Sequence, residues 1–111
     1  MATNLNTRNV ADPGNGKAIP VTNANIVCAL TSAGAGETRT LAIPKIEGQT
    51  CALCLEADGG SLAVTAASAV NQAGNTVMTF AHLDDSCFLQ AVKKAGVLRW
   101  QVVGEDGIAF S

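Results

Sequence analysis

The stretch Glu37–Glu56, ETRTLAIPKIEGQTCALCLE, contains two runs in which apolar side chains alternate with their neighbours. In the first run, Arg39, Leu41 and Ile43 share one side, and Pro44 ends the run because proline has no N–H for a ladder. The second run starts after Gly48 and places on one side Cys51, Leu53 and Leu55. A period of two is typical of half-buried strands. We therefore expect a β-hairpin here.

The same alternation recurs along the rest of the chain, between turns such as SAGAG at 32–36 and DGG at 58–60. No amphipathic helix of three turns is visible. The further strands that we expect are Lys17–Val21 (an edge strand, because of Pro20), Ile26–Thr31, Ser61–Ala66, Thr76–Phe80, Ser86–Lys93, Val97–Val103 and Ile108–Phe110. Seven to nine short strands predict an all-β fold, a compact antiparallel β-sandwich or barrel.

The length of 111 residues indicates one domain. Residues 1–18 are polar and rich in turn-forming residues, and their only sizeable apolar side chains are Leu5 and Val10. We interpret residues 1–18 as an extended N-terminal arm and residues 19–111 as the β-domain. Two alternatives stay open for the arm: a floppy terminus, or a segment that orders on a partner.

The composition favours a protein that works through its surfaces. Aromatic residues make up only 4% of the chain, with a single tryptophan, so a partner subunit is expected to supply further burial. The net charge is −2 and the seven Lys and Arg residues are scattered, which argues against a nucleic-acid binder. No stretch resembles a signal peptide or a membrane span, so we expect synthesis in a cytoplasm and no membrane contact.

The expected core anchor is Trp100, which aligns with Leu98 and Val102 on one side of a strand. An aromatic side chain in this position contributes a large apolar area to a core. We expect these three residues to pack against aliphatic side chains of the opening hairpin, Leu53 among them.

Cys51 and Cys54 form a C-x-x-C pattern, which in other contexts indicates zinc or a redox pair. Residues three apart in a strand point to opposite faces, so the two sulfurs diverge. The remaining candidate ligands, Cys28, Cys87 and His82, form no second close pair. We therefore expect free structural cysteines, with no metal and no disulfide between Cys51 and Cys54.

Residues 82–86, HLDDS, could suggest a catalytic triad or, with Glu105 and Asp106, a calcium site. Triads are assembled from separate elements, whereas these residues share one turn. The acidic residues also lack the dense oxygen pattern of a calcium loop. We expect solvated turn residues, no cofactor and no enzymatic activity.

Several strand and turn signals occur together in residues 36–111. They are T-R-T-L-x-x-P at 38–44, G-Q at 48–49, D-G-G-x-x-x-V-T at 58–65, N-x-x-G-N-T-x-x-T-F at 71–80, L-x-A-V at 89–92 and W-x-V-x-x-x-D-G at 100–107. In this combination the chain resembles small virion proteins of tailed bacteriophages, commonly capsid decoration (cement) proteins. It departs from their pattern at Cys51, Cys54 and Cys87, where aliphatic or polar residues are more usual.

The resemblance implies a homotrimeric β-domain with an N-terminal arm, on the outside of the virion capsid. Such a protein binds the major capsid protein and braces the shell against internal DNA pressure. On this reading Leu5, Arg8 and Val10 of the arm contact the shell. The alternatives are a trimeric tail or fibre module that binds a host surface glycan, and a small enzyme or metal protein.

Overall fold

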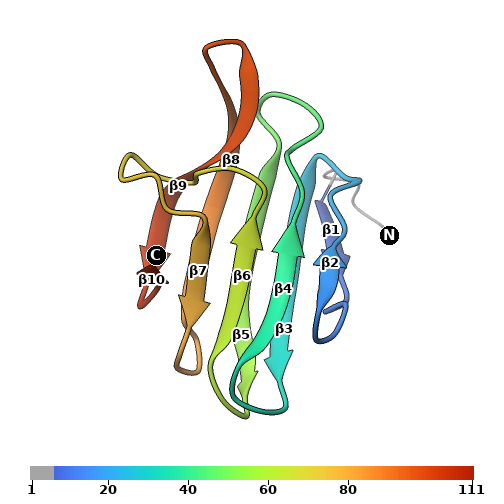
Figure 1. Ribbon diagram of the computed structural model, residues 1–111. Coiled ribbons are helices and arrows are strands. Elements are labelled where there is room, and N and C mark those ends of the chain that lie inside the picture. Colours follow the sequence, from blue (N-terminus) through green and yellow to red (C-terminus); the bar gives the residue numbers. More distant parts are fainter. Residues whose placement is uncertain (1–6) are drawn as a thin grey trace, which may run out of the picture.

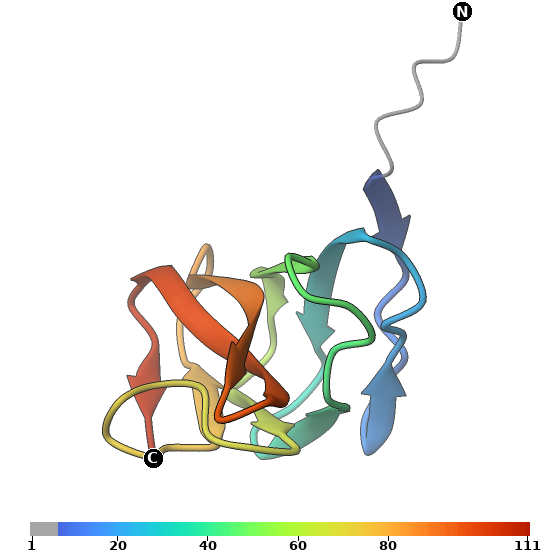
Figure 2. The same ribbon diagram turned by 90° about the horizontal axis from the view of Figure 1, so that it is seen from above.

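The computed structural model describes residues 7–111, which form ten strands and no helix. The strands form two five-stranded sheets that pack face to face (Figures 1 and 2). Sheet A contains, in spatial order, β1 (Thr7–Val10), β3 (Asn25–Ser32), β5 (Thr50–Asp58), β8 (Ser86–Lys94) and β9 (Val97–Asp106). Sheet B contains β10 (Ala109–Phe110), β7 (Val77–Phe80), β6 (Leu62–Ala66), β4 (Glu37–Leu41) and β2 (Lys17–Ile19).

The predicted all-β sandwich is confirmed, but it is not a closed barrel and its strands are not all antiparallel. From β1 to β6 the chain alternates between the two sheets, so neighbours within a sheet run parallel: β1 with β3, β3 with β5, β2 with β4, and β4 with β6. From β7 onward the pairing is antiparallel. In the first half of the chain, each strand therefore crosses to the other sheet. In the second half, the strands pair with antiparallel neighbours.

The expected hairpin at Glu37–Glu56 is wrong. Both strands exist, but β4 lies in sheet B and β5 lies in sheet A. The connection between them is held open by Gln49, which is buried and whose side-chain amide donates to the carbonyls of Val21 and Asn23. The connection is therefore anchored to the segment before β3, and it carries the chain from sheet B to sheet A, as a crossover between parallel strands requires.

The turns of successive coils stack on one another at one end of the sandwich. The Gly16 N–H donates to Thr38 O (2.8 Å), Gly36 N–H to Ser61 O (3.0 Å) and Gly59 N–H to Ser32 O (2.7 Å). A Cβ at Gly60 would overlap the backbone of the turn below it, and Gly60 has a φ of +148°. Glycine is required there because no other residue lets two backbones approach so closely.

The core lies between the sheets and follows the predicted alternation. In β3 and β6, and in the first six residues of β5 and of β8, every second side chain is buried. Leu53 and Trp100 belong to this core, and Val102 packs against it while partly exposed. Leu98 is half-buried and lies outside the core cluster, because the β8–β9 hairpin extends beyond sheet B there. The indole N–H of Trp100 donates to Ala42 O (2.8 Å) and ties β9 to the end of β4.

Candidate interaction surface

The three arm residues that were expected to contact a shell lie in different places. Leu5 lies outside the described residues. Arg8 lies in β1, in register with Ile26 of β3. Val10 packs against the protein's own core, so it is not a side chain free for a partner. Within residues 7–18, β1 is an edge strand of sheet A, and the chain from Lys17 onward begins β2.

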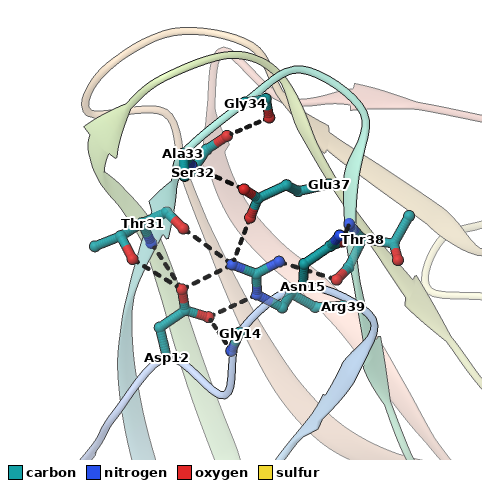
Figure 3. A network of polar contacts seen from close by, with 10 residues as sticks. All are labelled: Asp12, Gly14, Asn15, Thr31, Ser32, Ala33, Gly34, Glu37, Thr38 and Arg39. Carbon is teal, nitrogen blue, oxygen red and sulfur yellow. Dashed lines mark hydrogen bonds and ion pairs between the residues drawn. The ribbon is translucent and has the colours of Figure 1, made fainter.

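The segment after β1 is fixed by a buried ion pair that the sequence interpretation missed (Figure 3). Arg39 of β4 is almost fully buried, and its guanidinium contacts both oxygens of Asp12, at 2.6 Å from Nε to Oδ1 and 2.8 Å from the terminal nitrogen to Oδ2. This bidentate geometry is the strong form of the interaction. Asp12 also accepts hydrogen bonds from the backbone and the hydroxyl of Thr31. Three segments therefore meet on one carboxylate.

The remaining donors of Arg39 are also used. They reach the carbonyls of Thr31 (2.9 Å) and Thr38 (3.0 Å) and the carboxylate of Glu37 (3.1 Å). Burial acts to raise the pKa of Asp12, but the hydrogen bonds from Arg39, Thr31 and Gly14 outweigh it and lower the pKa to about 2. The hydrogen bond to Asp12 raises the pKa of Arg39. The network is a structural latch, because every charge in it is satisfied within the fold.

The cysteines behave as the strand geometry predicts. Cys51 is buried in the core, whereas Cys54 faces the outside and is half-buried, and all four cysteines are free. Burial raises the pKa of Cys51 to about 12, so this thiol is a packing group rather than a nucleophile. Within residues 7–111 no group of His, Cys, Asp and Glu has the geometry of a metal site.

The acidic turn at residues 81–85 differs from the expectation in one residue. His82 and Asp84 are exposed, as expected for a solvated turn, but Asp85 is buried. Its Oδ2 accepts hydrogen bonds from the backbone N–H groups of Ala81 and His82, both at 2.9 Å. Asp85 therefore caps its own turn, and this use of the carboxylate explains its burial.

An apolar groove lies on the outer face of sheet A. Pairing across four strands aligns Val27, Ala52, Phe88 and Gly104 in one row, with Val27 and Phe88 39% and 43% exposed. Because Gly104 has no side chain and nothing lies within contact of its Cβ position, the row ends in a hollow of about 390 Å³. The β-bulge between Phe88 and Leu89 leaves Val103 unpaired beside it.

The groove also has acidic side chains in its lining. Glu105 and Asp106 of β9 line it, together with Cys54 and Ser86. Burial, followed by the negative charges of Asp84, Glu56 and Asp85, raises the pKa of the Cys54 thiol. The groove thus offers an apolar floor and a negatively charged rim, which suits an apolar group flanked by cations.

The alternation in Ser86–Lys93 contains a signal for this groove. It places Phe88 on the face opposite Cys87, Leu89 and Ala91, that is, on the solvent side. A large apolar side chain on that face becomes part of a contact surface when it belongs to a contiguous apolar patch. The alignment with Val27 and Gly104 could not be read from the sequence, because it depends on which strands are neighbours.

Comparison with known proteins adds no assignment. No family model matches the chain, and no curated protein matches it at a significant level. No helix in residues 7–111 could cross a membrane, since that part of the chain contains strands only.

Proposed function

We propose that this chain is a structural protein of a virus particle: a capsid decoration protein that sits on the outside of a tailed-phage head as a homotrimer. Its partners are two further copies of itself and the major capsid protein, and it acts by bracing the shell, without a cofactor or a catalytic step. It is made in the cytoplasm of the host bacterium. The motif resemblance of residues 36–111 supports this proposal, and so does the all-β sandwich.

The observation that carries the proposal is where the exposed apolar side chains lie. Val27 and Phe88 gather over a hollow on an open sheet face. The outer face of sheet B is uncharged, and Ala18, Thr40 and Thr65, which lie in one row across β2, β4 and β6, are exposed. An apolar hollow and an uncharged β-face suit contact with other proteins, where charged residues are depleted from the centre of the interface.

The N-terminus remains the proposed contact to the shell. Among the described strands, nothing pairs with the outer side of β1, so its backbone groups are available to a strand of the major capsid protein. Leu5 and Arg8 would contact the shell beside it. Three such segments on one trimer would bind together and gain through effective concentration, by roughly 10²–10⁴ in favourable geometry.

The test mixes the purified protein with undecorated capsids and counts the bound copies by mass. The informative variant deletes residues 2–6 only, because deleting residues 2–14 would also remove Val10 and Asp12 from the fold. We expect the shorter variant to melt like the parent and to lose part of its occupancy, because it lacks Leu5 but keeps Arg8 and the outer edge of β1. Full occupancy would assign the contact to the β-body, and absence of binding by the parent protein would refute the capsid proposal.

One observation favours the alternative of a trimeric tail or fibre module. Phe88 is an exposed aromatic beside two carboxylates, a combination that also suits a sugar ring. The number of copies per particle separates the two functions: hundreds of copies place the protein on the shell, and a few place it in the tail. Glycan binding that is lost in Phe88→Ala would support the tail function.

A further inference from the structure

The β8–β9 hairpin projects beyond the rest of the sandwich, at the top of Figure 1. Lys94 pairs with Val97 across the two-residue loop Ala95-Gly96, whose φ values of +52° and +80° are those of a tight type I′ turn. Val97 at the tip is 56% exposed. The hairpin thus presents one apolar side chain on a well-defined turn.

The hairpin is also the most basic part of the described chain. Residues 93–99, KKAGVLR, hold three cations and no acid. Lys93 and Lys94 are exposed, and Lys94 Nζ contacts only Gln101 (2.7 Å) among hydrogen bonds within residues 7–111. The Nε of Arg99 is buried and has no hydrogen-bond partner in the same part of the chain.

The groove on sheet A has the complementary character and lies toward the other end of the same strands. Its floor is apolar at Val27, Phe88 and Gly104, and its rim carries Glu105 and Asp106. Glu56, Asp58 and Asp84 lie near that end as well, with no lysine or arginine in residues 54–60, 81–87 or 104–111. One end of sheet A is therefore basic and protruding, and the other is acidic and hollow.

We propose that the β8–β9 hairpin of one copy docks in the groove of the next copy, with Val97 over Phe88 and Gly104 and with the cations of the hairpin against Glu105 and Asp106. In this arrangement each copy gives its hairpin to one neighbour and receives the hairpin of another copy in its groove, so the contact is head-to-tail. A head-to-tail contact closes into a ring when its rotation is 120°, which gives the homotrimer of the proposed function. The contact itself does not depend on binding to a capsid.

Cysteine crosslinking tests this geometry directly, because Cys54 lines the groove and is the one cysteine that is not buried. In the full-length Val97→Cys variant, mild oxidation should link position 97 of one copy to Cys54 of another, as identified by peptide mass mapping. Val97→Cys combined with Cys54→Ala should lose the link. Thr65→Cys, on the exposed outer face of sheet B, is the matched control and should not link to Cys54.

A charge exchange provides a second, independent test. Lys94→Glu and Glu105→Lys should each weaken self-association by roughly tenfold, and the double variant should recover much of it. Gly104→Leu should block the groove, since space is free at that position. Lys17→Glu, in β2 of sheet B, is the control for net charge. Sedimentation at micromolar concentration measures the self-association of all five variants.

The outcomes separate this contact from the proposed function. The hairpin contact would be overturned if the parent protein is monomeric, even if it decorates capsids. It would also be overturned if the trimer is unchanged by both the charge exchange and Gly104→Leu. A Cys54 link with paired charge rescue would establish the contact even if no capsid is bound.

Discussion

Replacing Asp12 by asparagine should loosen the attachment of the N-terminal segment to the sandwich. Asparagine preserves the shape but removes the negative charge opposite Arg39, whose side chain is only 1% exposed, against 9% for Asp12. A buried guanidinium without its counter-charge is strongly destabilising. The variant therefore tests whether the latch stabilises the fold, as its geometry indicates.

The magnitude follows from the pKa of Asp12, which falls from an ordinary 3.8 to about 2. Since one pKa unit corresponds to about 1.4 kcal/mol, the ionised carboxylate contributes about 2 kcal/mol to the free energy of unfolding at neutral pH. The uncompensated Arg39 adds to the loss, up to about 3–5 kcal/mol in total. A loss of at least about 2 kcal/mol lowers the Tm of a domain this size by about 8 °C or more.

The sign of the pH dependence is fixed by the direction of the shift. The folded-state pKa of Asp12 is lower than the unfolded value, so its contribution is present above the unfolded pKa and is lost as the pH falls from about 4 toward 2. Urea unfolding followed by the fluorescence of Trp100 should therefore show a large difference between parent and Asp12→Asn at pH 7 and a much smaller one at pH 2.5.

The control is Glu37→Gln, which removes the second carboxylate of the same guanidinium. Glu37 makes only one contact with the guanidinium, at 3.1 Å, and its other oxygen accepts from Ala33 N–H, so Glu37→Gln should destabilise the fold less than Asp12→Asn. If Asp12→Asn unfolds like the parent at pH 7, or if its deficit is the same at pH 7 and pH 2.5, the ion pair does not hold the segment and the reasoning fails.

Three further predictions concern the core, the stacked turns and the cysteines. Trp100→Ala should cost about 3–5 kcal/mol, measured by circular dichroism in urea; unchanged stability would place the indole outside the core. Gly60→Ala should cost more than Gly14→Ala, because both have positive φ but only Gly60 meets a neighbouring backbone; equal Tm values would contradict the stacked turns. Cys51→Ser should cost about 1–3 kcal/mol by burying a hydroxyl, whereas Cys54→Ser should stay within about 0.5 kcal/mol, and the reverse order would mean that the strand faces are exchanged.

Strand positions could be predicted from the sequence because alternation is a local property. Period-two burial in β5, β6 and β8 requires only that one face meets a core, and a turn signal such as DGG separates the strands wherever they go. The same reasoning placed Arg39 on the side of Leu41, which is the buried side in the structure. The divergence of Cys51 and Cys54 followed for the same reason.

Strand pairing and both sites depended on the tertiary structure, because they join residues far apart in the chain. The carboxylate that neutralises Arg39 lies 27 residues away, at Asp12, and nothing local marks it as the partner. The groove requires Val27, Phe88 and Gly104 to lie in one row. That row crosses β3, β5, β8 and β9. Alternation tells each strand which face is buried, but a parallel neighbour and an antiparallel neighbour satisfy that condition equally well. The choice between them is made by the connections, such as the one that Gln49 anchors between β4 and β5.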